Sequence, residues 1–339
     1  MAKMSYNICV LAGDGIGPEV TACARQVLDS LCEKTDGLAL TFEAHDAGCD
    51  FYERTGESLT EETLEAAKAA DAVMVGAFDV ARLPPGARQP LHALRHEFDV
   101  HASVRPSRSY VGLDSSYGPI DVVVVREVTE GIYSGIEYYA GADAACAVRL
   151  ITRAASTRTA EIAFQQASQR RGKVAAVHKL GALKLTDGLF IESVGEVAKR
   201  YPDVIFETRN IDACALELIR HPGDFDVIVA TNTFGDILSD VASGVGGGLG
   251  LAPSSCIGAR WAYFEPVHGT APDIAGKGIA NPLATILSTA MMLRYLGEPA
   301  AADRVEQAVE TVIANGPRTG DLGGQAGSAD VTAAVIEAL

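Results

Sequence analysis

Short apolar runs recur along the chain, and each is followed by a polar or glycine-containing turn. They are YNICVLAG (6–13), ADAVMVGA (70–77), IDVVVVRE (120–127), GKVAAVHK (172–179) and FDVIVATN (225–232). Such runs predict strands, and the helical patterns between them produce the alternation typical of an α/β protein. Because the run VVVV is apolar without interruption, we expect a sheet that is covered on both faces. Functional groups in such sheets tend to lie where strands end.

Two other segments refine this pattern. The stretch LAGDGIGPEV (11–20) lacks the third glycine of a dinucleotide-binding loop and has Pro18 where a helix begins. It therefore favours a plain strand–turn–helix connection, and we do not predict a Rossmann fold. The stretch ANPLATILSTAMMLRYLG (280–297) predicts an apolar helix, buried in a core or in an oligomer interface.

Composition narrows the classes of function. The 339 residues are 48% hydrophobic and 21% charged, which indicates a globular protein of two domains or one elaborated domain. The net charge of -16 argues against a general nucleic-acid or anionic-membrane partner, and a small anionic ligand would need locally gathered cations. The seven cysteines are scattered, without a Cys-x-x-Cys pair, and no long apolar segment occurs. We expect reduced thiols and a cytoplasmic location.

Three acidic residues follow predicted strands. Asp236 and Asp240 lie four residues apart in TNTFGDILSD, directly after FDVIVA, and Asp212 lies in NIDACALEL. Two aspartates at this spacing are most often solvated surface charge. Their position and the third acid favour instead a site for Mg²⁺ or Mn²⁺, which prefer oxygen ligands. Zinc would call for sulfur or imidazole ligands nearby.

Cationic and proton-transferring side chains gather in the same segments. Arg95, Arg105 and Arg126 could bind the carboxylates of a small polycarboxylate, and Arg126 ends the valine run, where a charge needs a partner. Tyr133 follows Arg126 by seven residues, and Lys179 ends another apolar run. Near a divalent cation the lysine could act as a base, although an isolated lysine at a strand end is usually structural.

Five stretches together resemble one enzyme family. They are GDGIGPEV, VVVREVTEGIYSGIEY, HKLGALKLTDGLF, TNTFGDILSD and FEPVHGTAPDIAGKGIANP (264–282). They are similar to the β-decarboxylating dehydrogenases of (2R,3S)-3-substituted malates, which include isocitrate, homoisocitrate and isopropylmalate dehydrogenases. The resemblance extends from about residue 6 to the C-terminus. Segments such as TEGIY and HKLGALKLTDG look more like those of the homoisocitrate and isocitrate branch.

The resemblance implies an isopropylmalate dehydrogenase-like α/β fold. It would consist of two domains in an open, mostly parallel arrangement that is distinct from the Rossmann fold. Residues 1–98 plus 246–339 would form the cofactor-side domain, and residues 99–245 would form the central domain. An arm near residues 134–152 would clasp the partner in a homodimer whose active sites are shared between subunits.

The same resemblance implies a role for each site residue. Substrate carboxylates would bind Arg95, Arg105 and Arg126, and proton transfer would use Tyr133 and Lys179. The metal would bind Asp212, Asp236 and Asp240, with Lys179 and Asp212 coming from the second subunit. The residues implied for NAD binding are Glu265, His268, Gly269, Asp273, Ile274 and Asn281. Asp273 would accept the adenosine ribose hydroxyls, so NAD is expected over NADP. The reaction implied is oxidative decarboxylation.

The prediction of which group the malate substrate carries at C3 depends on His92. In QPLHALR it precedes Arg95 by three residues, so on a helix both share one face. By resemblance, isopropylmalate enzymes have leucines in this turn and homoisocitrate enzymes have an arginine at this position. Histidine can donate a hydrogen bond or become cationic, so we predict a polar or acidic substituent, carboxylate or phosphonate. Leu91 keeps 3-isopropylmalate open, and a surface histidine without a role also stays open.

Two alternative functions belong to other classes of protein. A non-catalytic regulatory subunit would keep the fold but lose the chemical residues, all of which this sequence retains. A Mg²⁺-dependent hydrolase or phosphoryl transferase could use the same aspartates. It would leave the arginines and HGTAPDIAGKGIANP unexplained.

Overall fold

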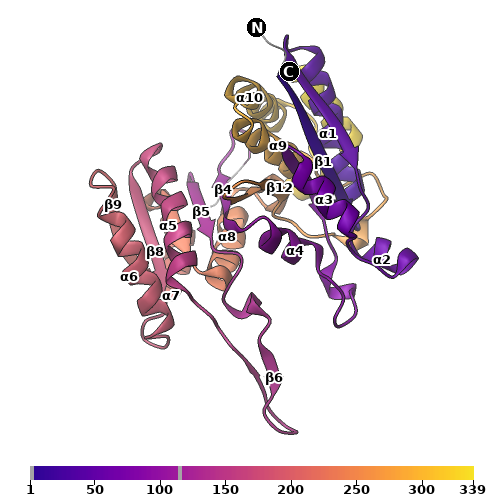
Figure 1. Cartoon of the computed structure of the whole chain (residues 1–339). Helices are drawn as coiled ribbons and strands as arrows, with labels where there is room; N and C mark the ends of the chain where they lie inside the picture. The colour runs from indigo at the N-terminus through magenta and orange to yellow at the C-terminus, as the bar shows by residue number, and fades with distance from the viewer. Residues whose placement is uncertain (1–3, 114–116) are drawn as a thin grey trace. The chain divides into compact units, whose positions relative to one another are not determined.

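The computed structural model describes residues 4–113 and 117–339. These residues divide into two compact units. Unit 1 contains the described residues up to 99, residues 110–113 and residues 247–339. Unit 2 contains residues 100–109 and 117–246. Each unit is built from its own strands and covering helices (Figure 1).

Five strands form the sheet of unit 1 in the order β2-β1-β3-β12-β11. Their bounds are β1 Met4–Gly13, β2 Leu38–Ala44, β3 Ala72–Ala77, β11 Pro253–Gly258 and β12 Ala262–Pro266. The strands run parallel except for the β11/β12 pair, which is antiparallel. The first and last parts of the chain therefore build one sheet.

The helices of unit 1 cover this sheet and supply its core. They are α1 Gly17–Glu33, α2 Cys49–Thr55, α3 Glu61–Ala69, α4 Pro90–Glu97, α9 Leu283–Tyr295, α10 Pro299–Asn315 and α11 Ser328–Ala338. The short 3-10 turns are η1 Val80–Arg82, η4 Leu249–Leu251, η5 Pro272–Ile274 and η6 Gly320–Leu322. The predicted apolar helix is α9, and it is buried on nearly all sides among α1, α10 and the strands. Its core position confirms the first of the two expectations for that segment.

The turn between β1 and α1 packs closely against neighbouring loops of unit 1. The carboxylate of Asp14 is fully buried and accepts hydrogen bonds from the backbone N–H groups of Cys49, Asp50 and Asp79 at 2.8–2.9 Å. Gly15 has a positive φ of 60°, and a Cβ there would lie 2.2 Å from the Thr270 carbonyl oxygen. The glycines therefore serve close backbone approach, in agreement with the prediction of a fold other than Rossmann.

Five strands form the main sheet of unit 2 in the order β4-β5-β10-β8-β9. Their bounds are β4 Val100–Arg108, β5 Asp121–Arg126, β8 Lys173–His178, β9 Ile205–Asn210 and β10 Val227–Ala230. All neighbours are parallel except β4 and β5. A mostly parallel α/β arrangement was predicted, whereas the two antiparallel pairs were not, because an apolar run carries no sign of its direction.

The helices of unit 2 are α5 Arg153–Ser168, α6 Thr186–Ala198, α7 Ile211–Arg220 and α8 Asn232–Gly246, with the turns η2 Ile132–Ser134 and η3 Pro222–Asp224. A separate antiparallel hairpin, β6 Glu137–Tyr139 with β7 Ala145–Ala147, extends from this α/β body (Figure 1). The side chains of Tyr138 and Tyr139 on it are 55% and 83% exposed. The hairpin thus offers apolar and aromatic surface to its surroundings.

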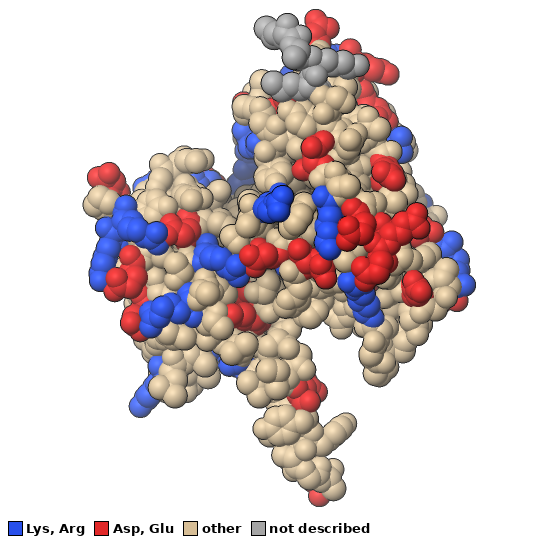
Figure 2. All heavy atoms as spheres, in the orientation of Figure 1, with Lys and Arg blue, Asp and Glu red and all other residues tan. Residues whose placement is uncertain are grey.

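Charged side chains of both signs are interspersed on the face drawn in Figure 2. Several form exposed ion pairs, such as Arg82 with Asp50 and Arg54 with Asp46. The β6/β7 hairpin contains two acidic residues, Glu137 and Asp143, and no Lys or Arg, and red atoms are visible on it in this view. Within the described residues, none of the helices has the length and apolar character that crossing a bilayer requires.

Candidate active site

Arg126 ends β5 and is only 3% exposed, so its charge depends on nearby partners. Its Nε and Nη2 donate to the Asn232 side-chain oxygen at 3.1 and 2.7 Å, and its Nη1 pairs with the Asp236 carboxylate. Asn232 and Asp236 both lie on the first turns of α8, which follows β10, the strand beside β5. The sequence predicted that Arg126 needs a partner, and the adjacent strand β10 and helix α8 supply it.

Arg105 reaches the same carboxylate from β4. It is 6% exposed, and its Nη1 donates to Asp236 Oδ1 at 3.2 Å and to the Ser239 hydroxyl at 2.9 Å. Its Nε donates to Ser103 at 3.1 Å. Antiparallel pairing of β4 with β5 sets the two arginines on adjacent strands, with Ser103 opposite Arg126. Two buried cations consequently converge on Asp236.

A glycine permits the close approach of α8 to β5. A Cβ at Gly235 would lie 2.8 Å from the Cβ and Cγ of Arg126, nearer than real Cβ contacts come. Gly244 lies on the same helix and has open space at the corresponding position. The glycine of TNTFGD is therefore needed for space beside Arg126.

Tyr133 and Asp240 complete this cluster. The Tyr133 hydroxyl donates to Asp236 Oδ2 at 3.1 Å, and its ring centroid lies 5.5 Å from the Arg126 guanidinium carbon. Partial burial raises the pKa of the Asp240 carboxyl, and the Asp236 charge raises it further, whereas Arg105 and Arg126 lower it. A cation placed between the two aspartates would relieve their repulsion, so the carboxylate pair fits a hard divalent ion.

Lys179 and Asp212 form a second cluster in unit 2. Lys179 follows β8, and its Nζ pairs with the Asp212 carboxylate at the start of α7. Among the residues that the structure describes, no group of three His, Cys, Asp or Glu side chains is arranged to hold a metal ion. The three aspartates of one chain are thus divided between two clusters.

A buried carboxylate supports the backbone of Lys179. Asp187 is fully buried and accepts from the Lys179 N–H at 2.5 Å, and its other oxygen lies 2.8 Å from Arg149 Nη1. Arg149 also donates to the hydroxyls of Thr186 and Thr231 at 2.6 and 3.0 Å. Sequence reasoning missed this network. The one feature of the sequence that could have indicated this network is Asp187, an acidic residue in the mostly apolar stretch LTDGLF.

Arg95 belongs to unit 1 and lies on α4. Its Nε donates to the hydroxyl of the fully buried Tyr263 at 3.0 Å, and its Nη2 lies 3.8 Å from Glu265 Oε1. The Glu265 side chain, 8% exposed, also accepts from the Cys256 thiol at 3.7 Å. Tyr263 was not anticipated, because it occupies one position among many in an apolar strand.

His92 and Arg95 lie on the same helix, as the sequence predicted. His92 is exposed, and its Nε2 lies 3.0 Å from Nε2 of His96, one turn further along α4. His96 was also missed, although the four-residue spacing could have indicated it.

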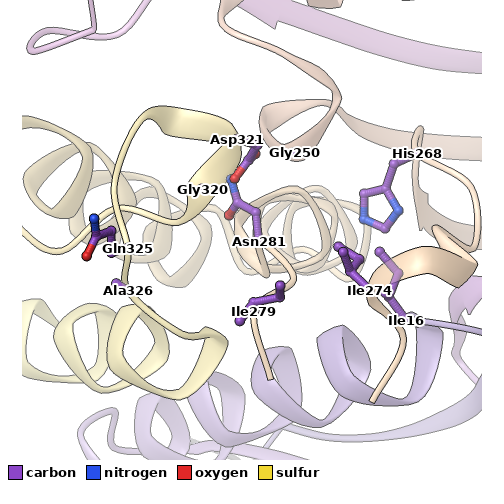
Figure 3. Close-up of a pocket in the computed structure, with 10 residues that line it drawn as sticks. All are labelled: Ile16, Gly250, His268, Ile274, Ile279, Asn281, Gly320, Asp321, Gln325 and Ala326. Carbon is purple, nitrogen blue, oxygen red and sulfur yellow. The ribbon is translucent and has the colours of Figure 1, made fainter. Parts of the chain in front are cut away.

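A cavity of about 460 Å³ lies within unit 1 (Figure 3). Its lining residues come from the β1–α1 turn, η4, the 264–282 segment and the 320–326 segment, and they are Ile16, Gly250, His268, Ile274, Ile279, Asn281, Gly320, Asp321, Gln325 and Ala326. Figure 3 shows the isoleucine side chains on one side of this space and the polar side chains on the other. An apolar cavity with a few polar groups suits a flat heterocycle such as adenine.

The polar groups of this cavity are only partly satisfied. His268 Nε2 is buried and has no hydrogen-bond partner among the described residues, while Nδ1 lies 2.9 Å from the Gly269 carbonyl oxygen. Burial lowers the pKa of His268, opposed by the Gly269 carbonyl and the Asp321 charge. Asn281 donates to Asp321 at 2.9 Å. A neutral imidazole with an unpaired nitrogen is a ready partner for a ligand hydroxyl. Asp273 lies in η5, exposed and adjacent to Ile274.

Comparison with known proteins agrees with the resemblance read from the sequence. The family model described as isocitrate/isopropylmalate dehydrogenase matches residues 7–339. An isocitrate/homoisocitrate dehydrogenase of Thermus thermophilus is 49% identical over 340 residues, covering 99% of both chains. The 3-isopropylmalate/3-methylmalate dehydrogenase of Methanocaldococcus jannaschii is 48% identical and covers 94% of both.

A solved structure extends this likeness to three dimensions. It is the isocitrate dehydrogenase of Methylococcus capsulatus, with a TM-score of 0.92 and 41% identity, covering 98% of this chain and 99% of that one. At this identity and coverage, fold and family are shared. The chain belongs to the isocitrate/isopropylmalate dehydrogenase family, a family of NAD-dependent decarboxylating dehydrogenases.

Proposed function

We propose that the protein oxidatively decarboxylates a (2R,3S)-3-substituted malate that bears a polar or acidic substituent, using NAD and Mg²⁺ or Mn²⁺. The observation that carries this proposal is the convergence of two buried arginines on one aspartate, with Tyr133 bonded to the same carboxylate. Two guanidinium groups exceed what one carboxylate needs. Arg105 and Arg126 are therefore suited to bind substrate carboxylates in a fixed orientation, together with Arg95.

The donor set fits a hard divalent cation. Asp236 and Asp240 would hold the metal together with the partner subunit's Asp212, because oxygen ligands suit Mg²⁺ and Mn²⁺. When bound, the cation polarises the substrate oxygen and stabilises the negative charge that develops as CO₂ leaves. Arg126 and Arg105 would then exchange part of their contact with Asp236 for contact with the substrate.

Two side chains would move protons. Lys179 Nζ would take the proton of the C2 hydroxyl, directly or through water, and the Tyr133 hydroxyl would deliver a proton to C3 after decarboxylation. Within one chain Lys179 is paired with Asp212, apart from the cluster around Asp236. This separation supports a homodimer in which each active site takes Lys179 and Asp212 from the partner. The β6/β7 hairpin lies within the arm of residues 134–152 and exposes Tyr138 and Tyr139, so it is suited to hold that dimer together.

The cavity of unit 1 is suited to the adenosine half of NAD. His268, Gly269, Ile274 and Asn281 would line or approach the nucleotide, and Glu265 would face the nicotinamide end beside Arg95. Residues 1–98 plus 246–339 would accordingly form the cofactor-side domain, with 99–245 as the central domain. The carboxylate of Asp273 would bind ribose hydroxyls and repel a 2′-phosphate, so NAD should be preferred over NADP.

The substituent remains the open choice. His92 on the face of Arg95 supports a polar or acidic group, which favours homoisocitrate or isocitrate. A 3-isopropylmalate activity is the alternative, and the names of the related enzymes from Thermus thermophilus and Methanocaldococcus jannaschii include both kinds of substrate. A non-catalytic regulatory subunit is the alternative from another class of protein. The intact charged clusters argue against it, because such a subunit would have lost catalytic residues.

The test is a kinetic panel. NADH formation should be fastest with homoisocitrate or isocitrate, slower with isopropylmalate, weaker with NADP, and abolished by EDTA until Mg²⁺ or Mn²⁺ is returned. His92→Leu should shift kcat/KM toward isopropylmalate. Full turnover in metal-free buffer would contradict the metal assignment, and an isopropylmalate preference untouched by His92→Leu would contradict the polar pocket.

A further inference from the structure

Two histidines on α4 face one another. His92 and His96 are four residues apart, both are exposed, and their Nε2 atoms lie 3.0 Å apart. Their ring centroids are 4.3 Å apart, with the planes inclined by 63°. Positions four apart share one face of a helix, so the backbone itself brings these rings together. Of these two histidines, only His92 has a role in the proposed function, and His96 has none.

The spacing of the two nitrogens matches a chelating pair. Metal–imidazole distances are about 2.0–2.1 Å, so two nitrogens 3.0 Å apart would subtend roughly 95° at a shared ion. That angle is close to the right angle of square-planar and octahedral sites, which Cu²⁺ and Ni²⁺ adopt. A small opening of the side chains would reach the tetrahedral angle of Zn²⁺.

The helix that carries the pair is held in place. Leu94 and Phe98 on and beside α4 are fully buried, and Phe98 stacks on Trp261 with ring centroids 5.8 Å apart. Arg95, on the same helix, donates a hydrogen bond to the buried Tyr263 hydroxyl. A ligand pair on an anchored helix loses little conformational freedom when it binds, which favours chelation.

We propose that His92 and His96 form a chelating site for a borderline divalent cation such as Ni²⁺, Cu²⁺ or Zn²⁺, with water in the remaining positions. Imidazole selects such ions, whereas the carboxylates of Asp236 and Asp240 suit Mg²⁺ or Mn²⁺. Binding replaces the contact between the two rings, with both Nε2 lone pairs directed at the ion and the ring protons on Nδ1. The site is thus chemically distinct from the hard-cation site.

Occupation of this site has a consequence for turnover, which rests on the proposed function. His92 precedes Arg95 by three residues, on the turn that we assign to the substrate substituent. An ion held by the pair would occupy the place of that substituent. The KM for the hydroxy acid should therefore rise while kcat stays nearly constant.

The binding test uses Ni²⁺ with tag-free protein in excess Mg²⁺, without substrate or NAD, in a calorimetric titration. Wild type should bind one Ni²⁺ per chain, and His92→Gln or His96→Gln should each weaken binding by about 10–100-fold or more, since even losing the support of a ligand costs that much. His221→Gln, an exposed histidine outside α4, is the matched control and should bind as wild type does. Circular dichroism confirms that each variant is folded.

Two further outcomes separate this inference from the proposed function. Wild-type Ni²⁺ affinity in folded His96→Gln would overturn the chelating site, whatever the enzyme's substrate. In kinetic assays, Ni²⁺ should raise the KM of wild type and leave that of His96→Gln unchanged, and without Ni²⁺ the two proteins should match. Tight binding with an unchanged KM would overturn the assignment of this turn to the substrate.

Discussion

At the scale of single residues, buried charges in unit 2 occur in matched sets. Arg126 is paired with Asp236 and Asn232, and Arg149 is paired with the fully buried Asp187. Breaking such a pair is costly, because the group that remains is left buried and uncompensated. Asp187 also accepts from the Lys179 N–H, so it is a positioning residue for the proposed base.

Asp187→Asn should affect both stability and turnover. Asparagine can still accept from the Lys179 N–H, but it leaves the Arg149 charge unbalanced. We expect the free energy of unfolding to fall by about 3–5 kcal/mol, and kcat to fall while KM for the hydroxy acid is nearly unchanged. Urea denaturation and steady-state kinetics measure these effects.

The control for this experiment is an exposed pair. Arg153 and Glu192 lie 3.1 Å apart, and their side chains are 52% and 60% exposed. Arg153→Gln should change the free energy of unfolding by no more than about 1 kcal/mol. Equal losses of stability in the two variants would contradict the special role of the buried network.

At the scale of elements, the packing of α8 on β5 places the charged cluster. The close approach depends on Gly235, where a Cβ would meet Arg126. Gly235→Ala should displace Arg126 and reduce kcat/KM on the order of 100-fold, which is the effect of moving a substrate-binding group by about 1 Å.

Gly244→Ala on the same helix is the control. Open space surrounds this position, and replacing a helical glycine by alanine should raise the free energy of unfolding by about 0.4–1 kcal/mol with kcat/KM unchanged. If Gly235→Ala behaves in the same way, the steric argument for α8 is wrong.

The elements also show what a sequence can disclose. The strand runs and the buried helix α9 were predictable, because burial on both faces of a sheet or around a helix leaves unbroken apolar stretches. The antiparallel pairs were not, since strand direction depends on partners distant in sequence. Arg126 signalled that it needed a partner, but Asn232 and Asp236 are 106 and 110 residues away. The metal, substrate and cofactor roles of the site residues stay predictions.

At the scale of the whole molecule, the separation of Lys179 and Asp212 from Asp236 leads to a test by complementation. Lys179→Ala and Asp236→Asn should each be nearly inactive. When the two are co-expressed or refolded together, half of the dimers are mixed and each mixed dimer has one intact site. Activity should recover to about a quarter of wild type, as expected for random pairing of two subunits.

The matched control combines Lys179→Ala with Asp212→Asn. If both residues reach the same site from the partner, every mixed dimer has one defect in each site, and no activity returns. Recovery in this control, or none in the first mixture, would contradict active sites shared in this way.

The chain order of unit 1 has a consequence for biosynthesis. Its core joins residues near the start, such as Ile8, to residues near the end, such as Val335, and the Ser328 hydroxyl contacts Glu19 across 309 positions. A nascent chain that has just emerged from the ribosome can assemble unit 2 from nearly continuous sequence. The core that α1, β1 and β3 share with α9, α10 and α11 stays incomplete until these last three helices have been translated. The interval before α9, α10 and α11 emerge is therefore when this protein most depends on chaperones to avoid aggregation.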